Sequence, residues 1–132
     1  MLVLVPLQVI DETWPEVAHF IEKAIEKNGT ETTIGDYFQM LRTGNAMLFV
    51  FQDGTGIHGA LIADIFTGRT GETARIWAWG ADKTLDWSVE FETLWVHFRK
   101  IGIKKVMCEG RPGIRALFPE SRVIRLVLEM DL

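Results

Sequence analysis

Asp64 is the first residue whose surroundings suggest chemistry. It is the only ionisable residue in the apolar run 61–66, Leu-Ile-Ala-Asp-Ile-Phe. A carboxylate held among apolar neighbours accepts a proton readily and can act as a general base toward an amine. The alternative is an ordinary aspartate at a strand end, with its side chain in water. The position therefore indicates either a base that faces a cleft or a solvated carboxylate.

Two further candidates lie close together after a predicted strand. Cys108 could act as a nucleophile if a nearby base raised its thiolate fraction, whereas free cysteine is commonly a small buried hydrophobe. Arg111 lies in Gly-Arg-Pro-Gly at the carboxyl end of that strand. Ligands favour this position in α/β folds, and a guanidinium suits phosphate or carboxylate. A structural ion pair is the alternative interpretation of Arg111.

The three histidines do not predict a metal site. His19, His58 and His97 have no spacing that would place two ligands on one face of an element. Surface positions are the default interpretation of all three, and no metal is expected.

Composition limits the classes of protein. The chain has 132 residues, 48% hydrophobic and 24% charged, which is typical of one globular domain spanning 1–132. A single cysteine excludes a disulfide scaffold. With 14 basic and 18 acidic residues the net charge is −4, which argues against a nucleic-acid partner. No signal peptide and no apolar run of the ~20 residues that span a membrane is found, so we expect a cytoplasmic protein without a membrane partner.

Hydrophobic periodicity predicts the elements that position these residues. The first half predicts a strand over 2–7 and two helices, one with the capping box Thr13-Trp-Pro-Glu16 and a stop at Asn28-Gly29, the other running from Thr33 to Thr43-Gly44. Tyr37 falls on the apolar face of the second helix. Short turns containing glycine then join three strands, which predicts an antiparallel meander over 46–51, 57–66 and 72–79.

The second half returns to the helical period. It predicts a helix from Asp86 to a stop at Gly102, a buried strand over 103–108, a loop over 110–113, a short helix over 114–118 and a last strand over 123–130. The five tryptophans fall mainly on the apolar faces of the third meander strand and the following helix, where core packing explains most of them. The order β-α-α-β-β-β-α-β-α-β indicates an α/β (α+β) fold with a mixed sheet.

A three-strand meander followed by a helix and a parallel strand resembles the GNAT superfamily of acyl-CoA-dependent N-acetyltransferases. The resemblance covers nearly the whole chain as an order of elements and is clearest over 95–113. The stretch Cys-Glu-Gly-Arg-Pro-Gly over 108–113 and the final strand also look like small GNAT-like proteins of tailed phages. The resemblance implies a GNAT-like fold, acetyl-CoA as cofactor and an amine as acceptor.

The sequence departs from the family's Q/R-x-x-G-x-G/A motif, whose glycines let backbone N–H groups approach the cofactor's pyrophosphate. The matching stretch, 83–88, has no glycine, and Asp82 and Asp86 would repel a pyrophosphate. The family often uses a tyrosine near the last helix as general acid. The only tyrosine here is Tyr37, which is expected in the core.

The resemblance implies roles for particular residues. Acyl-CoA would lie between 75–79 and 103–108, with the loop 80–88 beside the pyrophosphate. Asp64 or Glu109 would accept the amine proton, and a backbone N–H near Trp79 would hold the thioester oxygen. The residues expected to bind the cofactor are Trp79, Gly80, Lys83, Ser88 and Arg111.

Two functions from different classes fit this sequence. The first is a divergent N-acyltransferase, phage-encoded and active in the host cytoplasm on a small amine, an antibiotic or a lysine of a host protein. The second is a non-catalytic protein that binds a host or virion protein and has lost the cofactor site. The missing glycines favour the second function, whereas the order of elements is neutral.

The sequence also predicts self-association. The apolar run 123–128 carries only one charge, Arg125, and belongs to a last strand that leaves an exposed sheet edge. Unpaired backbone groups at such an edge invite another chain. We therefore expect a homodimer, or a docked partner strand, at the C-terminal region. The alternative is a monomer whose last strand is central and covered by the short helix over 114–118.

Overall fold

The structure, a computed structural model, describes residues 1–29, 31–110 and 112–132. Within these residues one sheet has the strand order β1-β2-β3-β4-β5, antiparallel except for the parallel pair β4–β5. The strands are β1 (Leu2–Leu4), β2 (Met47–Asp53), β3 (Gly56–Gly68), β4 (Gly71–Ala81) and β5 (Lys105–Cys108). The helices are α1 (Ile10–Asn28), α2 (Ile34–Arg42) and α3 (Trp87–Lys100), with the 3-10 turns η1 (Leu7–Val9) and η2 (Pro112–Leu117). The predicted mixed α/β sheet is confirmed.

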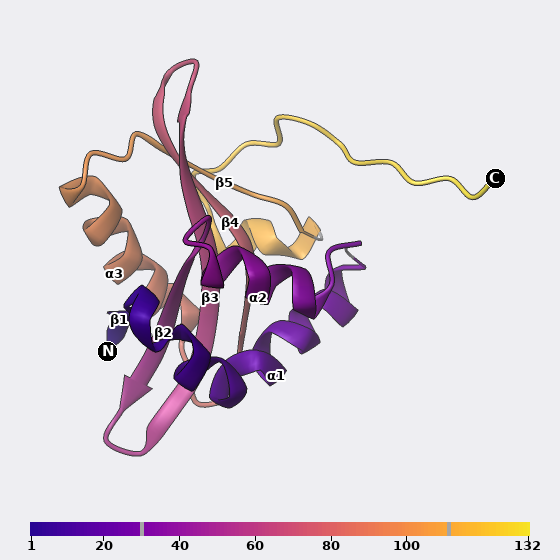
Figure 1. Cartoon of the computed structure of the whole chain (residues 1–132). Coiled ribbons are helices and arrows are strands. Elements are labelled where there is room, and N and C mark those ends of the chain that lie inside the picture. Colours follow the sequence, from indigo (N-terminus) through magenta and orange to yellow (C-terminus); the bar gives the residue numbers. More distant parts are fainter. Residues whose placement is uncertain (30, 111) are drawn as a thin grey trace.

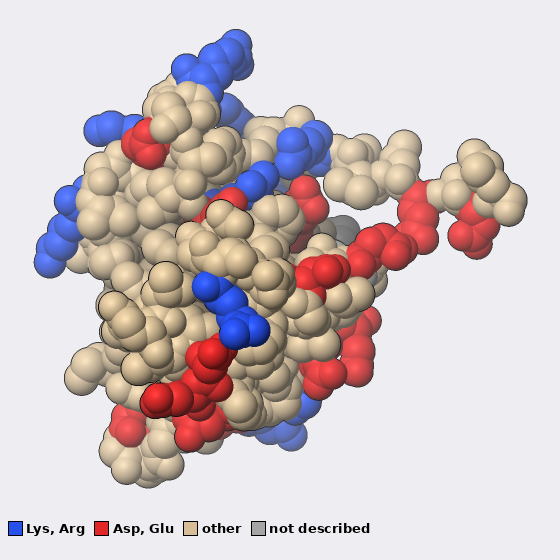
Figure 2. Space-filling model, viewed as in Figure 1, with Lys and Arg blue, Asp and Glu red and all other residues tan. Residues whose placement is uncertain are grey.

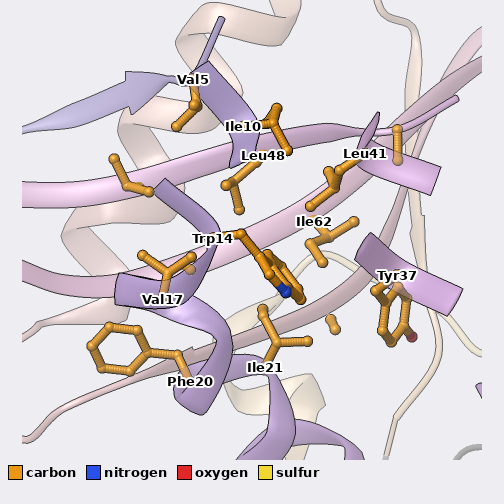
Figure 3. Packing of buried hydrophobic residues seen from close by; sticks show 14 of the residues in the cluster. Val5, Ile10, Trp14, Val17, Phe20, Ile21, Tyr37, Leu41, Leu48 and Ile62 are labelled. Atoms are coloured by element: carbon orange, nitrogen blue, oxygen red, sulfur yellow. The ribbon is translucent and has the colours of Figure 1, made fainter. Parts of the chain in front are cut away.

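The helices α1 and α2 cover one face of the sheet, and α3 covers the other (Figure 1). On the first face Trp14 and Ile21 of α1 and Leu41 of α2 pack against Leu48 and Ile62 of the sheet (Figure 3). Four of these five side chains are fully buried, because apolar residues at helical spacing meet the alternating residues of the strands. This packing holds α1 over the sheet.

The second face buries one stripe of α3. Phe91, Leu94 and Phe98 are buried against Leu61 and Ile76. Trp79, Trp87 and Trp95 are partly buried members of the same cluster. Core packing therefore accounts for these three tryptophans, as predicted.

The predicted meander is confirmed, and its third strand contains an irregularity. Ile62 of β3 lies opposite Ala78, whereas the next residue of β3 lies opposite Ile76, so Trp77 is an extra residue in β4. Such a β-bulge bends a strand and increases its twist. The parallel pairing of β4 with β5 covers only 73–76 and ends just before this bulge.

The start of α1 differs from the prediction. The helix begins at Ile10 rather than after Thr13, because the 3-10 turn η1 already sets the helical path before it. The Thr13 hydroxyl lies inside the helix and donates to the Val9 carbonyl at 2.9 Å. Pro15 is therefore inside the helix as well. The first strand ends at Leu4 rather than residue 7, just before Pro6, which has no N–H to pair.

The last strand predicted over 123–130 is wrong. Residues 119–132 have no helix or strand, and the segment extends away from the body of the molecule (Figure 1). An isolated strand is not stable without a neighbour that pairs its backbone groups. The predicted helix over 114–118 is the 3-10 turn η2. No helix among the described residues is long and apolar enough to cross a membrane.

Candidate functional site

A cleft of about 500 Å³ opens where β4 leaves β5. This volume lies within the roughly 300–1,000 Å³ of small-molecule sites. The carboxyl ends of α1 and β4, the first residue of α3 and the segment after β5 form its walls. The described lining residues are Lys23, Ala24, Lys27, Asn28, Trp79, Gly80, Ala81, Trp87, Gly110, Gly113, Ile114 and Leu117.

The bulge at Trp77 explains why the cleft opens there. Beyond it, residues 78–81 of β4 still pair with β3 but have no pairing with β5. The buried Tyr37 of α2 donates from its hydroxyl to the Trp77 carbonyl at 3.4 Å and so supports the bent strand. An unpaired strand edge inside a cleft can receive an extended ligand through main-chain hydrogen bonds.

Two predicted cofactor residues, Trp79 and Gly80, line this cleft. The rings of Trp79 and Trp87 form an aromatic wall, at a centroid distance of 6.3 Å, and Trp79 also packs on the buried Phe91 at 5.7 Å. Gly80 has a packing role as well, because a Cβ at this position would clash with the Phe20 carbonyl of α1. Gly80 thus lets the backbone of α1 approach the sheet at the edge of the cleft.

Comparisons with known proteins find structural relatives only. No protein-family model and no curated protein matches the sequence. An aminoglycoside acetyltransferase from an uncultured soil metagenomic sample, solved with sisomicin, has a TM-score of 0.67 at 13% identity, over 99% of this chain and 96% of that one. A predicted acetyltransferase with acetyl-CoA from Clostridium acetobutylicum has a TM-score of 0.68 at 11% identity, over 99% and 95%.

A third similar structure is glucosamine-6-phosphate N-acetyltransferase from Arabidopsis thaliana, with a TM-score of 0.63 at 14% identity, over 99% of this chain and 98% of that one. The fold is that of the GNAT acetyltransferases. At these identities the comparison establishes the GNAT fold, whereas the chemistry must be argued from the cleft itself.

The amino end of α3, which follows β4, differs from a GNAT phosphate site. Asp86 is the N-cap of α3, and its Oδ1 accepts from the Ser88 backbone N–H at 3.0 Å and the Ser88 hydroxyl at 2.7 Å. These bonds lower the pKa of Asp86 and keep it charged. The helix terminus that would bind a pyrophosphate already holds the chain's own carboxylate. Lys83 is exposed, and neither Lys83 nor Ser88 is among the described residues that line the cleft.

Glu109 is not among the described residues that line the cleft. It is exposed, it precedes the lining residue Gly110, and its Oε1 accepts from Arg125 at 3.2 Å. Beside it, burial raises the pKa of the Cys108 thiol to about 11, and the Glu109 charge adds to the shift. Near neutral pH Cys108 is therefore a protonated, half-buried thiol, which favours the packing interpretation. Arg111, the remaining predicted cofactor residue, lies outside the described residues.

Asp64 lies away from the cleft. Its two carboxylate oxygens accept from Arg75 of β4, Oδ1 from Nε at 3.2 Å and Oδ2 from Nη2 at 2.9 Å. The Asp64 side chain is 16% exposed, and Arg75 stacks on the Trp77 ring at 4.4 Å. The apolar run around Asp64 gave no sign of Arg75, because the partner belongs to the next strand. The role of Asp64 as a base stays a prediction. Both oxygens of its carboxylate already accept hydrogen bonds from Arg75.

Sequence reasoning missed a cluster centred on His58. The imidazole Nε2 lies 2.9 Å from Asp53 Oδ1 and Nδ1 lies 2.8 Å from Asp82 Oδ2. The hydroxyls of Thr55 and Thr84 lie 2.7 and 3.0 Å from the same two nitrogens. The cluster joins the β2–β3 hairpin to the β4–α3 loop. A visible signal was the repeated Asp-x-Thr pattern at 53–55 and 82–84.

Hydrogen bonds within this cluster shift its titrations. Bonds to Asp82 and Asp53 raise the pKa of His58, which is 17% exposed. Bonds from Thr84 and His58 lower the pKa of Asp82 to about 2, and bonds from Thr55 and His58 lower the pKa of Asp53. The imidazolium form is therefore stabilised between two carboxylates. Among the described residues no group of three or more His, Cys, Asp or Glu side chains could hold a metal ion.

Proposed function

We propose that this chain is an acyl-CoA-dependent N-acyltransferase that binds its acyl donor in the cleft between the unpaired part of β4 and the segment after β5. The observation that carries the proposal is the divergence of β4 from β5 at Trp77, which opens a cleft against an unpaired strand edge. The same fold occurs in acetyltransferases, one of them solved with acetyl-CoA. An extended donor arm can pair with residues 77–81 while its acyl end lies near Trp79.

The chain's own groups have separate tasks in this proposal. When bound, the cofactor supplies an acyl thioester. Backbone N–H groups near Trp79 donate to the thioester oxygen, which gains negative charge as the amine attacks. Glu109 accepts the proton that the amine loses as the carbon–nitrogen bond forms and the carbon–sulfur bond breaks. The cofactor would supply the leaving thiolate, and the proton for that thiolate would come from water.

The acceptor and the setting belong to the same proposal. We assign as acceptor a small amine or a lysine of a host protein. The likeness of 108–113 to small GNAT-like proteins of tailed phages supports a phage-encoded protein that acts in the host cytoplasm. The sequence pattern is the support for this assignment.

Calorimetry with acetyl-CoA tests the proposal. Gly113 lines the cleft, and a Cβ there meets nothing within 4 Å, so Gly113→Leu should fill the cleft without straining the fold. Gly54, in the β2–β3 turn, has equally open space and gives the matched control Gly54→Leu. We expect the native protein and Gly54→Leu to bind acetyl-CoA and to gain thermal stability from it. Gly113→Leu should bind at least tenfold more weakly, a loss of about 1.4 kcal/mol.

A non-catalytic binding protein is the second candidate function. The observation that favours it is the Asp86 carboxylate at the amino end of α3, where a GNAT enzyme would place the pyrophosphate. Such a protein would keep the GNAT fold as a surface for a host or virion protein. Absence of heat and of any thermal shift with acetyl-CoA would exclude the enzyme and leave this second candidate.

A further inference from the structure

The cleft has a charged wall opposite its aromatic wall. Of the described residues that line it, only Lys23 and Lys27 are charged. The two lysines are four residues apart on α1, so they lie one above the other on one face of the helix. No acidic side chain is among the described lining residues, so the cleft favours an anion.

The two lysines are not accounted for by ion pairs. Among the ion pairs of the described residues, none includes Lys23 or Lys27. Like charges at this spacing slightly destabilise a helix. A position near the carboxyl end of α1 offsets part of that effect for Lys27, which lies in the last turn. It does not explain why both lysines line a cleft.

The opposite wall cannot supply the positive charge. Trp87, the first residue of α3, presents an aromatic ring to the cleft, and Asp86 caps the helix behind it. Asp82 on the same loop is also charged, because bonds from Thr84 and His58 hold its pKa near 2. An anionic ligand in the cleft is therefore repelled by the β4–α3 loop and attracted by α1.

We propose that Lys23 and Lys27 bind the phosphate groups of the acyl-CoA cofactor, in place of the amino end of α3. The inference rests on the proposed function, and it reassigns the polyanionic end of the cofactor to the wall formed by α1. The pantetheine arm would then follow β4 with its phosphates turned toward α1 rather than toward the β4–α3 loop. Lys83, on that loop, has no part in this arrangement.

Comparing the affinities for coenzyme A and for pantetheine, which lacks the phosphates, separates the contribution of the phosphate contacts from that of the other contacts in the cleft. We expect Lys23→Ala/Lys27→Ala to weaken coenzyme A binding roughly tenfold while pantetheine affinity stays the same. Lys23→Arg/Lys27→Arg keeps both charges and should retain most of the affinity. Lys83→Ala tests the alternative placement of the phosphates on the β4–α3 loop. Lys100→Ala, at an exposed lysine of α3 that is not among the described lining residues, is the control and should bind coenzyme A as the native protein does.

Salt gives a second measurement of the same contacts. Raising NaCl from about 0.05 to about 0.5 M should weaken coenzyme A binding by the native protein and change binding by the double alanine variant much less. Equal coenzyme A affinity in the native protein and the double alanine variant would overturn the inference while leaving the proposed function intact. So would an equal loss of pantetheine affinity, or a loss confined to Lys83→Ala. A native protein that binds neither ligand would overturn both proposals.

Discussion

Gly80 links the packing of the fold to the cleft at the scale of one residue. A methyl group there would collide with the Phe20 carbonyl, which is backbone and cannot turn aside as a side chain can. We expect Gly80→Ala to lower the free energy of unfolding by about 1–3 kcal/mol, because α1 must shift away from β4. Chemical denaturation of the variant and the native protein measures this difference.

Gly113→Ala is the matched control for Gly80→Ala. Gly113 lines the same cleft, but a Cβ there meets nothing within 4 Å, so its stability should change little. Equal stability of Gly80→Ala and the native protein would show that α1 does not lie on the sheet as described.

His58 predicts how stability depends on pH. Its pKa in the folded protein lies above the ordinary value of 6.5, so the cluster stabilises the fold fully below about pH 6.5. The stabilisation is lost as the pH rises through the raised pKa. At the acid end, the contribution of Asp82 is lost as the pH falls from about 3.8 through about 2.

Thermal unfolding of His58→Gln at pH 5.5 and pH 9 tests this dependence. The difference in Tm between the native protein and the variant should be larger at about pH 5.5 than at about pH 9. His19→Gln is the control, since no ion pair of the described residues involves His19. A difference that grows with pH would contradict the charged state assigned to His58.

The role of a single residue was predictable where the residues next to it in the sequence determine that role. Tyr37 is buried in the core as its place in the helical stripe predicts. The partners of Asp64 and His58 could not be predicted in this way. Arg75 and Asp82 lie on other elements, and only the strand register brings them within hydrogen-bond distance.

At the scale of elements, the β4–α3 loop is held at both ends. Asp82 is bonded to His58, and Asp86 caps α3 through Ser88. We expect Asp86→Ala to lower Tm by roughly 2–8 °C, because the first turn of α3 loses its cap. Asp86→Ser keeps a capping oxygen and should keep most of the stability, as circular dichroism melting would show. Equal losses in the two variants would mean that the carboxylate charge matters more than the cap.

The predictions of helices and strands succeeded where the hydrophobic period continued over the whole element and a turn or a capping residue marked its end. The three meander strands are long and separated by short turns, and the capping box at Thr33 and Asp36 marks the start of α2. The start of α1 was missed because η1 leads into the helix without a capping side chain. The bulge that opens the cleft is a property of strand pairing, which the sequence of β4 alone does not contain.

At the scale of the whole molecule, the C-terminal tail, residues 119–132, exposes apolar side chains. Leu126, Leu128 and Met130 are 79%, 88% and 79% exposed. In Figure 2 the tail projects from the body, with acidic atoms near its end. β5 is an edge strand, so its outer backbone groups have no strand partner among the described residues. The predicted last strand is absent from the isolated chain, and the homodimer stays a prediction.

The sequences of the tail and β5 are complementary. One ion pair joins the tail to the residue that follows β5, Arg125 to Glu109. An antiparallel pairing in that register places Val127 opposite Met107 and Glu129 opposite Lys105, an apolar pair and an ion pair. We expect the tail of each copy to add a strand to β5 of the other.

Light scattering at micromolar concentration checks this prediction. The native protein should be a dimer and Leu126→Lys a folded monomer, because a charge on the apolar face of the added strand opposes its burial. Leu7→Lys, an equally drastic change at an exposed leucine outside the tail, should stay dimeric. A native monomer, or a dimer that survives Leu126→Lys, would refute the exchange of tails.

A nuclear magnetic resonance titration with acetyl-CoA tests most directly whether the cleft binds an acyl donor. The titration follows the indole N–H signals of the five tryptophans. Trp79 and Trp87 line the cleft, whereas Trp14 is buried in the cluster on the face covered by α1. We predict that acetyl-CoA shifts the signals of Trp79 and Trp87 and leaves that of Trp14 in place, with assignments from single Trp→Phe variants. No shift at Trp79 and Trp87 at saturating acetyl-CoA would contradict the account of this protein as an acyltransferase.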